Sequence, residues 1–473
     1  MQGEVVATKV VPHLTRAERE ARGKAARNEV PRSSHAAFEP AAGRRDPVEL
    51  LEEQAESRVP ELVPIRYGRM LASPFAFYRG GALIMASDLA PSPRSGLTVQ
   101  LCGDAHLSNF GGFASPERRL VFDINDFDET LPGPWEWDVK RLAASFAVAA
   151  RENGYSEADR RTIALAAVRA YREAMRGFAS MHNLDVWYAH MDIEAAIVQF
   201  GAQASAKQVK RASAAVAKAR TRDSMQAFSK LTHMVDGEPR IVGDPPLIVP
   251  LDELADDALR ENLPAEMREI LRAYRSTLQN DRRLLLEQFR YVDAARKVVG
   301  VGSVGTRAWI VLMMGVDGGD PLFLQAKEAQ PSVLSSFLGK SRYANEGERV
   351  VRGQRLMQAA SDIFLGWHRA VRTLDGVERD FDIRQLRDWK ASADIESMVP
   401  QGMTLYARLC GWTLARAHAR SGDRVAIAAY LGGGDVFDRA LAEFAERYTD
   451  QNEQDYRQLQ QAVDAGRLQA VAA

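Results

Sequence analysis

Residues 296–314 read RKVVGVGSVGTRAWIVLMM, and this stretch predicts the architecture of the surrounding chain. Gly300, Gly302 and Gly305 match the pattern G-x-G-x-x-G between two apolar runs. A dinucleotide-binding fingerprint needs a helix straight after the glycines, whereas residues 309–313 are typical of a strand. We therefore predict a strand, a glycine loop and a second strand. Glycine suits such a loop because a Cβ would keep backbone amides away from phosphate.

The next strand, at residues 322–327, is predicted to end in a lysine, Lys327. This order of strand, glycine loop, strand and lysine-bearing strand resembles the ATP-binding part of protein kinases. The resemblance implies that Lys327 pairs with the phosphates and that a glutamate on the following helix orients it, Glu348 first and Glu346 second. It also implies phosphate contacts from Gly300, Gly302, Ser303, Gly305 and Arg307. A tight hairpin with an exposed lysine is the alternative.

An acidic cluster lies far upstream of the glycine loop. Asp104 and Asn109 follow a strand predicted at residues 97–101, and a hairpin later come Asp123, Asp126 and Asp128. Carboxylates and an amide concentrated at strand ends are ligands suited to Mg²⁺ holding a polyphosphate. The alternative is structural, because Asp and Asn also cap turns and helix starts.

The spacing Gly103-Asp104-x-x-x-x-Asn109 resembles the aminoglycoside and choline phosphotransferases of the kinase superfamily. The resemblance implies that Asp104 is the catalytic base or orients the hydroxyl group, and that Asn109 and a later aspartate hold magnesium. Asp126-Phe127-Asp128 is most similar to the kinase Asp-Phe-Gly position, and Asp123 is its rival. Cys102 stands where that family has histidine, and His106 is a candidate substitute.

The order of these segments is rotated relative to a kinase, because the acidic cluster precedes the glycine loop. Residues 410–420, with Leu414 and His418, resemble the helix that precedes the catalytic loop in those phosphotransferases. Rotating the chain restores the usual order, and a circular permutation is tolerated where chain ends are close together at the surface. Lys327 must then lie within a side chain's reach of Asp126.

The predicted fold is therefore α+β: a circularly permuted, two-lobed kinase-like fold with a largely helical lobe and a smaller antiparallel β-sheet lobe. We expect residues 1–46 to form a partly disordered N-terminal arm. Residues 47–294 would form the metal-binding and helical lobe, 295–400 the glycine-loop β lobe, and 401–473 helices packing on the helical lobe. Residues 73–81, aromatic and ended by glycines, are predicted to be a strand.

Five further motifs span most of the chain, at residues 66–70, 73–80, 103–111, 125–130 and 301–307. On these motifs the chain resembles the domain of unknown function 2252 family. The resemblance implies a kinase-like fold and names no substrate.

Composition indicates an ordinary globular protein. The 473 residues carry a formal net charge of −1, which does not favour nucleic acid or a membrane as a partner. Two cysteines exclude a disulfide framework. No signal-peptide pattern and no membrane-spanning run is present, so a cytoplasmic protein is expected. The oligomeric state is not indicated.

The function expected from these features is ATP- and Mg²⁺-dependent phosphoryl transfer to a hydroxyl group of a small molecule or protein. Nucleotidyl (AMP) transfer on the same fold, a non-catalytic ATP-binding module, and a metal-dependent hydrolase are the alternatives.

Overall fold

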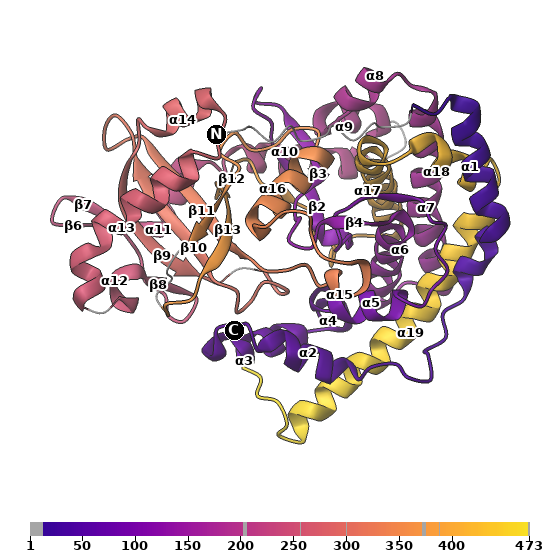
Figure 1. The fold of residues 1–473 in the computed structure, drawn as a ribbon, viewed down its shortest axis with the longest axis horizontal. Helices are drawn as coiled ribbons and strands as arrows, with labels where there is room; N and C mark the ends of the chain where they lie inside the picture. Colours follow the sequence, from indigo (N-terminus) through magenta and orange to yellow (C-terminus); the bar gives the residue numbers. More distant parts are fainter. Residues whose placement is uncertain are drawn as a thin grey trace, which may run out of the picture.

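The structure is a computed structural model that describes residues 13–201, 206–255, 257–298, 300–370, 375–386 and 388–471. It is a mixed α+β protein with antiparallel sheets, as the sequence predicts (Figure 1). A β-sheet part lies on the left of Figure 1 and a helical part on the right. Residues 1–12 of the N-terminal arm lie outside the described residues.

A six-stranded antiparallel sheet forms the core of the β part, in the order β12-β13-β11-β10-β9-β8. The bounds are β8 (Ile248–Pro250), β9 (Arg290–Lys297), β10 (Ala308–Met314), β11 (Pro321–Ala329), β12 (Gly366–Ala370) and β13 (Arg379–Gln385). The predicted hairpin is β9 and β10, and the predicted third strand is β11, with Lys327 opposite Ala308 on one side and Asp382 on the other. The sheet thus includes β8 and most of β9, which precede the boundary expected at residue 295.

Both faces of this sheet are buried, because apolar residues point alternately to each side. Val311 and Met313 pack with α13 (Asp257–Arg275), whereas Ile310 and Leu312 pack with α11 (Ser224–Leu231). Helix α16 (Glu346–Met357) follows β11 and contacts β12 and β13. The other helices between residues 183 and 338 are α8 (Asn183–Tyr188), α9 (Ile193–Gly201), α10 (Ala206–Arg220), α12 (Leu251–Leu254), α14 (Asn280–Leu286) and α15 (Ser335–Leu338).

The helical part is built from segments at both ends of the sequence. Helix α17 (Pro400–Ser421) packs along α7 (Glu157–Ser180), and α19 (Val436–Asp464) packs against α6 (Trp135–Glu152). In the N-terminal arm, α1 (Arg16–Glu29) begins at a capping box of Thr15 and Glu18 and packs on α18 (Arg424–Leu431). Described residues of the arm are therefore ordered, and the C-terminal helices complete the helical part.

Two small sheets lie between the two parts and carry the acidic cluster. One pairs β1 (Thr98–Leu101) with β4 (Leu131–Pro134). The other has the order β14-β2-β3-β5. Its strands are β2 (Phe110–Ala114), β3 (Leu120–Ile124), β5 (Met191–Asp192) and β14 (Ala391–Ser392). A separate hairpin joins β6 (Thr232–Val235) and β7 (Glu238–Ile241).

The strand predicted at residues 73–81 is wrong: the structure has α4 (Pro74–Gly80) there. Ser73 caps the helix by accepting a hydrogen bond from the Ala76 amide at 3.1 Å, and Pro74 occupies the first helical position. These start signals and the burial of Phe77 outweigh the strand preference of the aromatic residues. Along the chain, α4 is preceded by α2 (Pro47–Ala55) and α3 (Val63–Met70) and followed by α5 (Ala82–Leu89).

Among the described helices, none is both long enough and apolar enough to cross a lipid bilayer.

Candidate functional site

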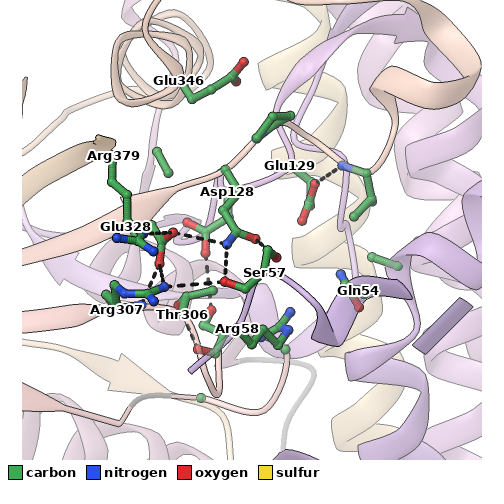
Figure 2. Close-up of a pocket in the computed structure, with 18 of the residues that line it drawn as sticks. Gln54, Ser57, Arg58, Asp128, Glu129, Thr306, Arg307, Glu328, Glu346 and Arg379 are labelled. Atoms are coloured by element: carbon green, nitrogen blue, oxygen red, sulfur yellow. Dashed lines mark hydrogen bonds and ion pairs between the residues drawn. The ribbon is translucent and has the colours of Figure 1, made fainter. Parts of the chain in front are cut away.

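A cavity of about 1060 Å³ lies between the glycine loop and the acidic cluster (Figure 2). The acidic cluster contributes Asp104, His106, Asn109, Asp126 and Asp128 to its wall. The glycine loop contributes Gly300, Val301, Gly302, Ser303 and Thr306. Two segments that the sequence separates widely therefore face one space.

A second cavity of about 950 Å³ adjoins the first, because Asp126, Gly300 and Ser303 line both. It extends past Lys327 and Arg384 to the segment that follows β13, including Leu386. Its basic lining residues outnumber its acidic ones; they are Arg118, Arg222, Lys230, Arg282, Lys297, Lys327, Arg384 and Lys390, against Glu117, Asp126, Asp362 and Asp388. This cavity suits an anionic ligand.

Lys327 connects the two segments. Its Nζ lies 2.6 and 2.7 Å from the two carboxylate oxygens of Asp128 and 3.6 Å from Oδ1 of Asp126. The distance that the rotated order requires is thus present. Burial opposes the charge on Lys327, but Asp126 and Asp128 outweigh it and raise the pKa of this lysine.

The two aspartates beside Lys327 have opposite pKa shifts. Burial, and then the charge of Asp126, raises the pKa of Asp128 to about 7. Burial acts in the same direction on Asp126, but Lys327 and Arg384 hold the pKa of that carboxyl below its usual range. About a third of each aspartate side chain is exposed, so both can be reached from the cavity. At such a site the lysine can pair with a phosphate group, and the two carboxylates can bind a divalent cation.

Asp104 is oriented by groups on three sides. Arg141 of α6 donates from Nε to Asp104 Oδ1, and Asn109 donates from Nδ2 to the Asp104 carbonyl at 2.8 Å. His106 Nε2 lies 3.6 Å from Asp104 Oδ2. Burial lowers the pKa of His106 to about 4, so its imidazole is neutral near pH 7. A fixed carboxylate beside a neutral imidazole can accept a hydrogen bond from a ligand hydroxyl.

The loop that presents Asp104 is held from below by Asp138. Its carboxylate accepts hydrogen bonds from the Cys102 amide at 2.8 Å and the Gly103 amide at 3.1 Å, and contacts His418 Nε2 at 3.1 Å. Gly103 has φ of 84°, and a Cβ there would lie 2.3 Å from the Glu129 carbonyl oxygen. His418 therefore lies beneath this loop, linked to it through Asp138.

Asp138 and Arg141 were not among the predicted site residues. They lie three residues apart on α6, so both face the Asp104 loop. Their spacing at the start of a helix after the acidic cluster is the sequence signal that could have identified them.

The glycine loop is anchored by the segment around α3. The Val59 amide donates to the Gly305 carbonyl at 2.8 Å, and Arg69 donates to the Gly300 carbonyl at 2.6 Å. Gly300 and Gly305 have φ of 66° and 90°, a region that favours glycine. Ser303 points to the acidic cluster, with Oγ 3.3 Å from Asp128 Oδ2.

Two predicted residues line or border the cavity with their charges already paired. Arg307 contacts Glu328 at 3.4 Å (Figure 2). It also contacts Asp375 at 2.9 Å. Glu346 pairs with Arg349. The charge of Arg307, which the kinase resemblance assigns to phosphate, is thus paired with carboxylates of the protein.

Two further predicted residues face other partners. Glu348 contacts Arg352 at 3.2 Å, so the structure does not bring it to Lys327, whose partners are aspartates. Asp123 is 1% exposed, pairs with Arg416 and accepts from the Ala359 amide at 2.8 Å. Its carboxylate is therefore saturated by the protein, which leaves Asp126 facing the cavity.

The described residues contain no group of three or more His, Cys, Asp or Glu side chains arranged to hold a metal ion. Mg²⁺ is usually held by one or two carboxylates together with waters and substrate phosphates. Asn109 and Asp126, both on the cavity wall, fit that smaller requirement, and Asp128 lies beside them.

Comparisons with known proteins leave the site geometry as the main guide to function. No curated protein and no solved structure matches the chain. The sequence model of one family matches residues 58–462, which include the acidic cluster, the glycine loop and Lys327. The chain belongs to this family, described as "uncharacterized protein conserved in bacteria (DUF2252)".

Proposed function

We propose that this protein is a phosphotransferase that moves the γ-phosphoryl group of ATP to a hydroxyl acceptor with the help of Mg²⁺. The observation that carries the proposal is the contact of Lys327 with Asp128 and Asp126 beside the glycine loop. Kinases combine a phosphate-pairing lysine, a magnesium-binding aspartate and a glycine loop in one cleft.

The proposal includes a circularly permuted, kinase-like fold. Three features support it: the lysine lies on β11, the strand that follows the β9–β10 hairpin, a helix follows that strand, and the Asp104 loop faces the hairpin. The helix that carries His418 also meets the Asp104 loop through Asp138, although the chain order separates them. Glu348 departs from the pattern, so aspartates take the place of the helix glutamate as partners of Lys327.

In this proposal the nucleotide occupies the second, basic cavity and the acceptor occupies the first. Asp126 and Ser303 lie on both walls, so the terminal phosphate would be at the boundary between them. Asn109 and Asp126 would hold Mg²⁺, which neutralises phosphate charge. Lys327 would exchange Asp128 for phosphate oxygens.

Transfer then requires few chemical groups from the protein. The acceptor oxygen forms a bond to the γ-phosphorus while the bond from that phosphorus to the β–γ bridging oxygen breaks. The hydroxyl proton passes to Asp104, and ADP leaves. Because Arg141 and Asn109 orient Asp104, positioning of the acceptor is the main contribution of this loop.

Labelled ATP tests the proposal. The full-length protein is incubated with Mg²⁺ and γ-labelled or α-labelled ATP, together with a mixture of hydroxylated small molecules and proteins. Transfer of the γ label alone is expected. Transfer of the α label would favour nucleotidyl transfer, and an unchanged melting temperature with saturating Mg·ATP would contradict every nucleotide-dependent function.

A further inference from the structure

Three arginines next to the glycine loop have no carboxylate partner among the described residues: Arg58, Arg66 and Arg79. Most other buried arginines of the chain are paired, as Arg416 is with Asp123 and Arg172 is with Asp438. Arg58 is 5% exposed and Arg66 is fully buried. Buried cations without a counter-ion are costly, so their retention needs an explanation.

Several guanidinium nitrogens of this arginine cluster are also without a hydrogen-bond partner among the described residues. They are Nε of Arg58, Nε and Nη1 of Arg66, and Nε of Arg79. Burial lowers the pKa of all three arginines, that of Arg58 to about 10. A bound anion would supply both the missing charge and the missing acceptors.

The backbone fixes the cluster in place. Arg58 donates to the Val304 carbonyl, and Arg66 donates to the Gly80 carbonyl at 3.3 Å and to Gln54. A Cβ on Gly302 would lie 3.4 Å from the Arg79 carbonyl oxygen, so the tip of the glycine loop borders this segment. The cluster is thus a built feature of the cavity wall.

Arg58 and Arg79 line the first cavity, with Asp104, and not the second. In Figure 2, Arg58 and Gln54 lie away from the cluster of Arg307, Glu328 and Arg379. The two arginines of that cluster pair with Glu328 and with Asp375. The two arginines of the first cavity without a carboxylate partner in the described part of the chain, Arg58 and Arg79, are therefore on the side of the glycine loop and α4.

We propose that Arg58 and Arg79, supported by Arg66, form a subsite for an anionic group of the acceptor, a phosphate or a carboxylate. Its assignment to the acceptor rests on the proposed phosphotransferase function, whereas anion binding does not. In the proposed function, the phosphates of the nucleotide would face Lys327 and the basic residues of the second cavity. A hydroxyl compound that also carries an anionic group would bind here and turn its hydroxyl toward Asp104.

Calorimetric titration of inorganic phosphate into the full-length protein tests this subsite. Each titration is run without nucleotide and with a saturating nonhydrolysable ATP analogue and Mg²⁺. Arg79→Gln is the main variant, and Arg58→Gln is the second because it also removes the bond to Val304. Arg369→Gln is the control: this arginine also lines the first cavity but pairs with Glu378.

Phosphate is expected to bind the wild type with and without the analogue. Arg79→Gln should weaken phosphate binding about tenfold, because one charge-assisted hydrogen bond is lost. Arg369→Gln should weaken it less than about twofold. Absence of phosphate binding, or equal weakening by Arg369→Gln, would overturn the proposal. Displacement of phosphate by the analogue would overturn it too, because the arginines would then serve the nucleotide.

The two proposals fail in different ways. If the analogue does not bind but phosphate still depends on Arg79, the phosphotransferase function fails and the anion subsite stands. If the analogue binds and phosphate does not, the subsite fails and the nucleotide site stands.

Discussion

Lys327 and Asp128 are 199 residues apart in the sequence, yet the lysine ammonium contacts both carboxylate oxygens of the aspartate, at 2.7 and 2.6 Å. Asp126 is also within 3.6 Å, and Asp382 lies opposite Lys327 on the neighbouring strand. The lysine ammonium therefore lies among three aspartates. We expect the same lysine to bind the nucleotide phosphate, so one side chain serves both the ion pairs of the site and the proposed chemistry.

Lys327→Met should lower the rate of phosphoryl transfer at least about 100-fold, because it removes a preorganised charge from the phosphate site. It also removes the lysine charge from beside Asp126, Asp128 and Asp382, so the pKa of Asp128 should rise further. Transfer from γ-labelled ATP and the melting shift with Mg·ATP measure the effect. Lys340→Met, at an exposed position of the same part of the chain, is the matched control. Retained transfer in Lys327→Met would contradict the proposed role.

Asp126 and Asp123 should behave differently, although the sequence made them rivals for the metal. Asp126→Asn should weaken Mg²⁺-dependent nucleotide binding at least about tenfold with little effect on folding, because a third of its side chain faces the cavity. Asp123→Asn should instead lower the free energy of unfolding by about 3–5 kcal/mol, because it leaves the buried Arg416 without its counter-charge.

Calorimetry of ATP with and without Mg²⁺, and urea unfolding of both variants, distinguish these outcomes. The assignment would be reversed if Asp123→Asn folded normally and lost Mg²⁺-dependent binding. It would also be reversed if Asp126→Asn were the unstable variant.

The sequence alone could predict the parts of the site that depend on local pattern. Glycines between two apolar runs gave the β9–β10 hairpin, and the run that ends at Lys327 gave β11. The spacing from Asp104 to Asp128 gave the acidic wall of the cavity. Each of these depends on a short stretch of sequence, where turn chemistry and strand periodicity act.

The parts that escaped prediction depend on contacts between distant segments. Arg416, which engages Asp123, is 293 residues away from it, and no local pattern marks that pair. The pairing of Glu348 with Arg352 instead of Lys327 reflects how α16 is turned against the sheet. Arg58 and Arg66 were not predicted, because only the folded chain brings their segment to the glycine loop, where Arg58 and Val59 donate to backbone carbonyls.

Gly305→Ala should destabilise the glycine loop by about 1–2 kcal/mol. Gly305 has φ of 90°, and an added Cβ would lie 3.0 Å from the Cβ of Arg58. Gly318→Ala is the matched control, because an added Cβ there has nothing within 4 Å and its φ lies outside the glycine-favouring region. Only Gly305→Ala should lower the free energy of unfolding measured in urea and the affinity for Mg·ATP. Equal stability of the two variants would show that the loop tolerates a side chain at Gly305.

Buried His35 should make the protein lose stability in acid. Burial, and then the charge of Lys140, lowers the pKa of His35 to about 3, against 6.5 for the free side chain. Between these values the unfolded chain binds a proton that the folded chain does not, so stability falls as pH falls from 6.5 toward 3. The contribution is about 1.4 kcal/mol per pH unit.

His35→Gln should reduce the slope of unfolding free energy against pH by that amount, measured by urea unfolding at several pH values between 4 and 6. The slope is the readout because the variant also changes the contact with Tyr430, which shifts the whole curve. Parallel curves for the wild type and His35→Gln would show that His35 does not carry the acid sensitivity.

Asp104→Asn separates catalysis from binding. If Asp104 accepts the proton of the acceptor hydroxyl, this change should lower the transfer rate by about 10²–10⁴-fold, while the dissociation constant for Mg·ATP changes less than about twofold. Some stability will also be lost, because Arg141 keeps its charge and loses its counter-ion.

Asp88→Asn provides the control, because Asp88 is a buried partner of Arg44 away from both cavities. Asp88→Asn should lose less stability, because Arg44 keeps Asp455 as a partner, and it should transfer phosphate at the wild-type rate below its melting temperature. If Asp104→Asn transferred as fast as Asp88→Asn, Asp104 would be a structural partner of Arg141 and not the residue that receives the proton.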